Sequence, residues 1–248
     1  MVFMFSGCVS FDKSESDILD KPTINLPLVP DEEEQEEDRK KTYIVSNASS
    51  LRIRSGAGTG YSTVGSIDKN DMLLYQGTKG NYYITTYKEQ QAFVHKDYCL
   101  LVEFDLSNDK IEKAIEFGAN LLGYPYVWGS QRYHWGNGKL NKNFVNGEFD
   151  CSAFVQYIYY KTNGVLLDVT SRAQSLEGEL VESGDLQRGD LMFFTNASRK
   201  DKVGIEKVGH VGIYFGNNYI LHTASDYAVI EPISSARWSY YLHSRRVV

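Results

Sequence analysis

The chain has 248 residues, of which 42% are hydrophobic and 23% charged, as is typical of a globular protein with one large or two modest domains. The net charge is −6 and no basic stripe occurs, so nucleic acid is not an expected partner. Three widely spaced cysteines form neither a disulfide framework nor a Cys-x-x-Cys zinc motif, and no apolar run approaches the ~20 residues of a membrane-spanning helix.

The first residues are apolar and end in Ser6-Gly7-Cys8, which resembles the lipobox of bacterial lipoproteins, where the cysteine carries the lipid. The apolar stretch is shorter than the ~7–15-residue core of a secretory signal and lacks a basic start. Residues 9–41 are polar and include an acidic run at 31–38, so they have too little apolar surface to fold. We therefore expect residues 1–41 to be a lipoprotein-type N-terminus, attached to the membrane through a lipidated Cys8, and a disordered linker.

From residue 42 to about 103, short β-like runs alternate with turn residues, and their spacing of about ten residues predicts a small barrel. The runs are 51–54, 64–67, 72–75, 82–87 and 92–95. The segment Leu51-Arg-Ile-Arg-Ser-Gly-Ala-Gly58 resembles the hallmark strand of bacterial SH3-like domains, which bind wall peptides or close one end of a catalytic groove. Cys99, near the end of this module, is expected to be a buried small side chain.

A helix is predicted next, because apolar residues recur at helical spacing from Ile111 to Leu122. Ser107 or Asn108 can cap its start, and Gly123 ends it.

A second helix is predicted to begin near Cys151, with Asp150 as its cap and Gly164 at its end. Free N–H groups and the helix dipole at such a start stabilise an anion, which lowers the pKa of a thiol towards neutrality. A lone cysteine there is most often a small packed side chain, so the catalytic interpretation of Cys151 depends on a partner base.

The partner comes from a predicted hairpin whose strands, Gly209–Gly216 and Tyr219–Ala224, follow a strand at 191–194. With a three-residue loop, the facing pairs are Phe215 with Tyr219, Tyr214 with Ile220, and Ile213 with Leu221. His222 then lies opposite Gly212, on the same face as His210, whereas a two-residue loop would put the histidines on opposite faces.

This arrangement predicts a thiol nucleophile at Cys151, with His210 as general base and His222 holding the ring of His210 in the working tautomer. The same three side chains are of types that bind zinc, but they lack close ligand spacing, and no metal or other cofactor is expected. The remaining histidines have no comparable setting and are expected to be structural. They are His95, His134 and His243.

Several motifs in order make residues 107–248 resemble the NlpC family of bacterial cell-wall cysteine peptidases. They are Pro125-Tyr-Val-Trp-Gly129, Phe149-Asp-Cys-Ser-Ala-Phe-Val-Gln156, Thr170-Ser171 with Gln174, Gln187-Arg-Gly-Asp-Leu191, Gly209-His-Val-Gly-Ile-Tyr-Phe-Gly216 and Arg245-Arg246-Val247. The resemblance implies a papain-like α+β domain with an antiparallel sheet and N-terminal helices, preceded by the SH3-like barrel at 42–103. Val169 and Arg188 depart from the family pattern, which often has Arg and Pro there, and the loop 130–148 is longer than usual.

The resemblance also implies residue roles. The catalytic residues would be Cys151, His210, His222 and Tyr126, the last near the oxyanion. The substrate-binding residues would be Asp150, Ser152, Ser171 and Trp128, and an acidic Asp150 would suit a free amino terminus on the substrate.

The implied activity is hydrolysis of peptidoglycan stem peptides between D-γ-glutamyl and a diamino acid, in wall turnover or recycling. Its partners would be peptidoglycan or muropeptide fragments. The protein would be a monomer in the cell envelope, either a membrane-anchored lipoprotein or periplasmic or extracellular. Two alternatives remain open at this point: an amidase or acyltransferase on the same fold, and a non-catalytic wall-binding protein.

Overall fold

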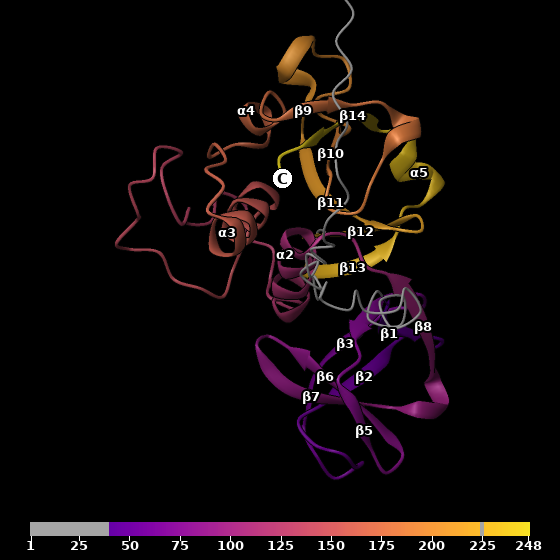
Figure 1. Ribbon diagram of the computed structural model, residues 1–248. Helices are drawn as coiled ribbons and strands as arrows, with labels where there is room; N and C mark the ends of the chain where they lie inside the picture. Colours follow the sequence, from indigo (N-terminus) through magenta and orange to yellow (C-terminus); the bar gives the residue numbers. More distant parts are fainter. Residues whose placement is uncertain (1–39, 224–225) are drawn as a thin grey trace, which may run out of the picture.

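The computed structural model describes residues 40–223 and 226–248 of the chain (Figure 1). The predicted lipidation site at Cys8 and the acidic run at 31–38 lie outside the described residues. In the two described ranges, no helix is both long and apolar enough to cross a membrane.

Eight short strands fill residues 40–105. They are β1 (Lys40–Ser46), β2 (Leu51–Arg54), β3 (Thr63–Ile67), β4 (Met72–Leu74), β5 (Gly77–Lys79), β6 (Tyr82–Tyr87), β7 (Gln90–His95) and β8 (Cys99–Asp105). All five runs predicted from the spacing of turn residues are strands, whereas β1, β5 and β8 were not predicted. Cys99, predicted to be buried, is only partly buried at the start of β8.

These strands divide between two antiparallel sheets, and no closed barrel is found in the part of the chain that the structure describes. One sheet has five strands in the order β3-β2-β7-β6-β5. The other three strands lie in the order β8-β1-β4 and continue into the sheet of the C-terminal segment, where Met72 of β4 faces Ile230. The predicted small barrel is therefore not seen, because β4 pairs with β1 and with a distant strand.

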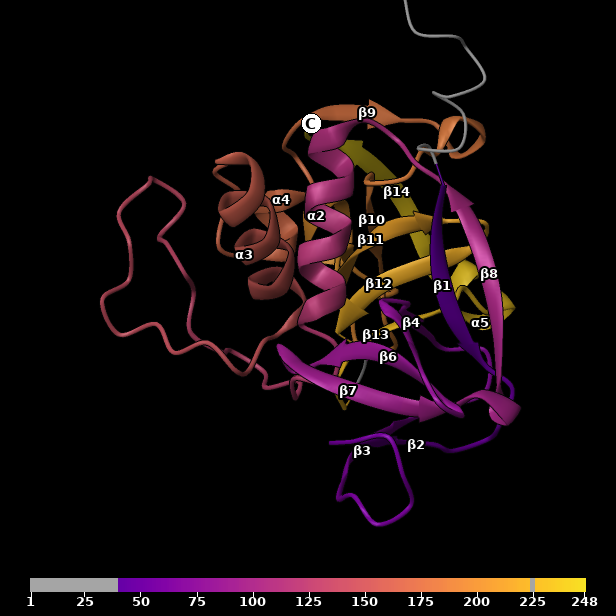
Figure 2. The same cartoon turned by 60° about the horizontal axis from the view of Figure 1, so that its bottom comes forward.

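Two helices cover one face of the larger sheet (Figures 1 and 2). Helix α2 (Asp109–Asn120) is capped by Asn108, whose Oδ1 accepts the N–H groups of Lys110 and Ile111 at 3.1 Å each. Helix α3 (Cys151–Asn163) is capped by Asp150, and it ends at Gly164, which has a φ of 68°. The starts of both helices and the end of α3 agree with the predictions from capping residues and glycines, whereas α2 ends at Asn120, before the predicted stop at Gly123.

The larger sheet has nine strands in the order β8-β1-β4-β13-β12-β11-β10-β14-β9. Its C-terminal strands are β9 (Glu179–Val181), β10 (Leu191–Phe194), β11 (His210–Gly216), β12 (Tyr219–Thr223), β13 (Ala228–Pro232) and β14 (Tyr241–Arg246). Short helices α4 (Ser171–Gln174) and α5 (Ser235–Trp238) and the 3-10 turns η1 (Lys96–Tyr98), η2 (Ser183–Asp185) and η3 (Gly204–Lys207) complete the fold. The fold is mixed α/β with antiparallel sheets.

The hairpin β11–β12 differs from the prediction at its tip. Asn217 and Asn218 have φ angles of 48° and 64°, so the turn has two residues, and Gly216, not Phe215, pairs with Tyr219. A bulge between Tyr214 and Gly216 adds one residue to β11 and restores the predicted pairs of Ile213 with Leu221 and Tyr214 with Ile220. His210 and His222 therefore lie on one face despite the two-residue turn.

Candidate active site

Cys151 is the first residue of α3, and its side chain is buried against the sheet. Burial and, to a smaller extent, the neighbouring carboxylate of Asp150 raise the pKa of the thiol to about 11, against the opposing effect of backbone hydrogen bonds from Val211 and Ser152. The helix start was expected to lower this pKa. The shift runs the other way because removing the sulfur from water outweighs the stabilising N–H groups.

His210 and His222 form a hydrogen-bonded pair on adjacent strands. Nε2 of His210 lies 2.8 Å from Nδ1 of His222, and the rings are 5.1 Å apart at 78°. Burial lowers the pKa of His222 and lowers that of His210 well below 6.5, so both rings are neutral at pH 7. His210 is adjacent in the chain to Val211, whose backbone faces the Cys151 thiol.

Two further residues, which the sequence analysis missed, extend this pair. Nε2 of His222 lies 2.9 Å from Oε1 of Glu231, and Nη2 of Arg237 donates to the same oxygen at 2.8 Å. Glu231 is in β13, where Val229 faces His222, so Glu231 lies on the face of the sheet that carries the histidines. Recognising 228–232 as a third strand after the hairpin would have revealed the carboxylate.

Two adjoining cavities open beside these groups. One, of about 350 Å³, is lined by Cys151, and the other, of about 600 Å³, is lined by His210. Tyr126, Asn196 and Gly209 line both cavities, so together they form one groove past the thiol and the imidazole.

The sequence-predicted substrate residues all line the cavity around Cys151. They are Asp150, Ser152, Ser171 and Trp128. Trp128 is 86% exposed, whereas Asp150, Ser152 and Ser171 are buried. Tyr126 also lines this cavity, and burial raises the pKa of its phenol, with Cys151 and Asp150 as further causes, so the hydroxyl stays protonated and able to donate.

Both carboxylate oxygens of Asp150 are already engaged by the protein. Oδ1 accepts the N–H of Ala153 at 2.9 Å and the hydroxyl of Ser152 at 3.0 Å. Oδ2 accepts the N–H of Gly129 at 3.2 Å and Nη2 of Arg132 at 2.8 Å. Arg132 comes from the long loop between α2 and α3, which projects from the molecule in Figures 1 and 2, and the sequence analysis did not identify it.

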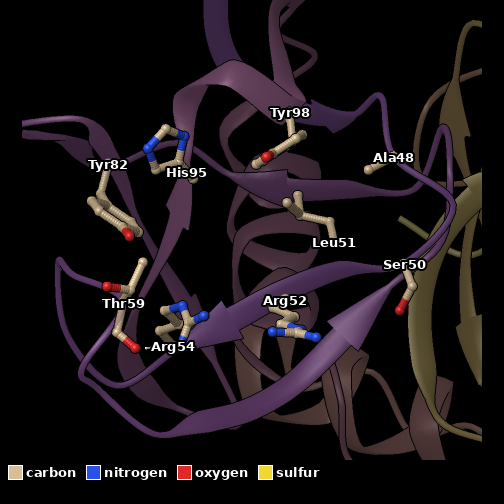
Figure 3. Close-up of a pocket in the computed structure, with 9 residues that line it drawn as sticks. All are labelled: Ala48, Ser50, Leu51, Arg52, Arg54, Thr59, Tyr82, His95 and Tyr98. Carbon is tan, nitrogen blue, oxygen red and sulfur yellow. Dashed lines mark hydrogen bonds between the residues drawn. The ribbon is translucent and has the colours of Figure 1, made fainter.

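The other three histidines bond elsewhere. Nδ1 of His134 accepts the N–H of Gly136 at 3.0 Å, and Nε2 of His243 lies 3.1 Å from the carbonyl of Ser175. His95 lines a separate cavity of about 370 Å³ in the N-terminal strands (Figure 3). In residues 40–223 and 226–248, no three His, Cys, Asp or Glu side chains are grouped as metal ligands would be.

A family model described as the NlpC/P60 family matches residues 123–247, which contain Cys151 and both strands of the hairpin. The chain belongs to the NlpC/P60 family. The matched segment lies inside the predicted domain at 107–248 and includes Tyr126, Glu231 and Arg237.

Among NlpC/P60 relatives, the chain is 32% identical over 147 residues to the peptidoglycan DL-endopeptidase CwlO of Bacillus licheniformis, covering 57% of this chain and 29% of that protein. It is 31% identical over 130 residues to the gamma-D-glutamyl-L-lysine dipeptidyl-peptidase of Bacillus subtilis, covering 52% of this chain and 37% of that protein. The chain thus spans less than half the length of these relatives. A crystal structure of an NlpC/P60 family protein from Bacillus cereus is 22% identical, with a TM-score of 0.45 over 86% of this chain and 66% of that one.

Proposed function

We propose that the chain is a cysteine endopeptidase that hydrolyses peptidoglycan stem peptides between D-γ-glutamyl and a diamino acid. The observation that carries the proposal is the 2.8 Å hydrogen bond between His210 and His222 in a groove shared with Cys151. The names of the two Bacillus relatives, an endopeptidase and a dipeptidyl-peptidase of wall peptides, support the same bond type.

In the proposed mechanism, Nδ1 of His210 takes the proton of the Cys151 thiol as the sulfur attacks the amide carbonyl. The backbone N–H of Cys151 and the hydroxyl of Tyr126 stabilise the resulting oxyanion. The C–N bond then breaks, His210 gives its proton to the leaving amine, and a thioester remains. Water, deprotonated by His210, cleaves the C–S bond and restores the thiol.

The raised pKa of Cys151 and the lowered pKa of His210 bear on the resting state. Since each group favours its neutral form, the free enzyme holds a thiol and a neutral imidazole, and the proton moves when the substrate binds. His210 therefore acts as a general base, and a preformed thiolate–imidazolium pair is not required.

The groove is better suited to a blocked peptide terminus than to a free amine. Arg132, Arg172 and Arg199 line the cavity around Cys151 with a single carboxylate, that of Asp150. Asp150 is 6% exposed, and both of its oxygens are hydrogen-bonded, so an ammonium group would have to displace Arg132 from a largely buried ion pair with this carboxylate. We therefore propose, in place of the expected amine site, that the enzyme takes stem peptides whose first amine is in amide linkage, as in peptidoglycan strands.

We also propose a domain assignment, an oligomeric state and a location for the chain. We infer that residues 42–103 are a divergent SH3-like module bordering the groove, that residues 107–248 are the peptidase domain, and that the protein is a monomer. The side chain of Glu89, between β6 and β7, accepts hydrogen bonds from Tyr124 and Asn146 at 2.7 Å each. These bonds hold the module against the segment that leads to Tyr126, which lines the groove. An envelope location, with lipid attachment at Cys8, completes the proposal.

The test uses synthetic stem peptides with a D-γ-glutamyl–diamino acid bond, each made with a free and with a lactyl-capped first residue. The full chain is expected to release the diamino acid fragment from both peptides, with a higher kcat/KM for the capped one, and mass spectrometry identifies the bond. Cys151→Ala is expected to lose hydrolysis and keep peptide binding.

Glu103→Gln, on an exposed strand, serves as the unaffected control because its carboxylate lies outside the groove. Release of lactate from the capped peptide instead would indicate an amidase, and binding without cleavage by the wild type would indicate a wall-binding protein. A preference for the free peptide would contradict the proposed selectivity for a capped terminus, and it would leave the assignment of the enzyme as an endopeptidase unchanged.

A further inference from the structure

The four side chains of His210, His222, Glu231 and Arg237 form a continuous chain of hydrogen bonds. The heavy-atom distances along it are 2.8 Å from His210 to His222, 2.9 Å to Glu231 and 2.8 Å to Arg237. Its inner end is buried, since His222 has no exposed surface, while Glu231 and Arg237 are each 27% exposed.

The charges of Glu231 and Arg237, at the outer end of this chain of hydrogen bonds, decide which nitrogen of His222 carries its hydrogen. Arg237 is a permanent cation, and its guanidinium donates to Oε1 of Glu231. The pKa of Glu231 is lowered by His222 and Arg237 against the effect of burial, so this side chain is a carboxylate at neutral pH. A carboxylate only accepts hydrogen bonds, and therefore Nε2 of His222 must carry the hydrogen that it shares with Glu231.

The second step follows from the neutral state of both rings. A neutral imidazole has one N–H and one lone pair, so the hydrogen on Nε2 leaves Nδ1 of His222 as an acceptor. The 2.8 Å bond to His210 can then form only if Nε2 of His210 is the donor. The lone pair of His210 is consequently on Nδ1, the atom not engaged by His222.

We propose that Glu231 is a positioning residue that sets the tautomers of His222 and His210 and so places the basic lone pair on Nδ1 of His210, with Arg237 holding its carboxylate in place. This inference rests on the proposed role of His210 as the base for Cys151. The carboxylate is needed because a neutral His222 can carry its hydrogen on either nitrogen. Without the acceptor Glu231, His222 could donate from Nδ1 to Nε2 of His210, and both rings would then change to the opposite tautomer.

The charge of Glu231 also acts when His210 becomes an imidazolium. The positive charge on His210 then lies one neutral ring away from the carboxylate, an arrangement similar to that of an acidic residue behind a catalytic histidine. Arg237 offsets part of this attraction, since its charge lowers the pKa of His210. The pair Glu231–Arg237 therefore orients the rings without making His210 a strong base.

The experiment combines kinetics with two-bond ¹⁵N–¹H NMR of the histidine rings in the full chain. Glu231→Met removes the acceptor at similar length, and Glu231→Gln keeps an oxygen for His222 and Arg237 while removing the charge. The Met variant is expected to lower kcat on the order of 10- to 100-fold with little change in KM, as removal of other orienting partners does. The Gln variant is expected to recover most of that loss.

The spectra are expected to show hydrogen on Nε2 of both His210 and His222 in the wild type and in Glu231→Gln, and mixed tautomers in Glu231→Met. Glu103→Met is the matched control, because Glu103 is also a strand glutamate with a basic neighbour, Lys40 at 3.9 Å, but is exposed. It is expected to leave the tautomers and kcat unchanged.

Two results would overturn the inference. One is a wild-type spectrum with hydrogen on Nδ1 of His210, which requires no variant to fold. The other is a folded Glu231→Met protein that keeps both wild-type tautomers. Because the spectra need no substrate, failure of peptide hydrolysis with the expected tautomers would contradict the proposed function and leave the role of Glu231 intact.

Discussion

At the scale of single residues, Cys151 is subject to two opposing effects. Its place at the start of α3 exposes it to free N–H groups that favour a thiolate, and its burial to 8% exposure favours the neutral thiol. Burial dominates, and the pKa is raised to about 11. The nearby base is correspondingly weak, because burial keeps the pKa of His210 well below 6.5.

These opposite shifts predict how Cys151 reacts with a small neutral alkylating agent such as iodoacetamide. Since the thiolate is populated only as the pH approaches about 11, alkylation is expected to be slow at neutral pH and to rise steadily on the alkaline side. Site-resolved mass spectrometry separates Cys151 from Cys99, whose pKa burial raises to about 12. An alkylation plateau extending to about pH 5, the behaviour of an ion pair, would contradict this assignment.

At the scale of elements, the loop length predicted for the hairpin β11–β12 was wrong, but His210 and His222 still lie on the same face of the sheet. The Asn-Asn turn is shorter than predicted by one residue, and the bulge adds one residue back. Gly212 is essential to the close approach of the two strands at His222. A Cβ there would lie 2.9 Å from Cβ of His222 and 2.6 Å from Cδ1 of Ile220.

Gly212→Ala is therefore expected to push His222 away from His210 and to reduce kcat. Overpacking of this kind typically costs about 1–3 kcal/mol of unfolding free energy, measured by denaturant titration. Gly60→Ala is the control, because a Cβ at Gly60 meets nothing within 4 Å. Equal stability and kcat in Gly212→Ala and Gly60→Ala would show that the strands adjust freely at this point.

At the scale of the whole molecule, Arg188 joins three parts of the chain. Its guanidinium pairs with both carboxylate oxygens of Glu112 in α2, at 2.8 and 3.0 Å, and donates to the hydroxyl of Tyr43 in β1 at 2.8 Å. It also donates to the carbonyl of Phe215 and lies 4.2 Å from the centre of that ring. Arg188, which stands where the family often has Pro, thus links the N-terminal strands to the helix and sheet of the C-terminal segment.

Removing this link is expected to weaken the whole molecule. Arg188→Met leaves the carboxylate of Glu112, which is 14% exposed, without its cation, and breaking a buried pair costs about 3–5 kcal/mol of unfolding free energy. Urea unfolding, followed by circular dichroism and by tryptophan fluorescence, measures the loss of unfolding free energy. It also shows whether the two signals change at the same urea concentration.

Lys40→Met, which removes an exposed partner 3.9 Å from Glu103, is the comparison and is expected to change stability by about 0.5 kcal/mol or less. The double variant Arg188→Met/Glu112→Leu is expected to recover part of the loss, since it leaves no unpaired charge. Equal unfolding curves for Arg188→Met and the wild type would contradict a coupling role.

The sequence by itself determined the features that depend on local pattern. Capping residues and apolar spacing located both helices, because side-chain direction follows from backbone period. The shared face of His210 and His222 was predicted for a three-residue loop, but it arises from a two-residue turn together with a bulge in β11, which strand alternation does not predict. Tertiary structure alone decided which distant groups meet: Glu231 behind His222, Arg132 against Asp150, and β4 beside β13. It also decided the pKa of Cys151, since the burial of a sulfur depends on elements far apart in the chain, which no local pattern records.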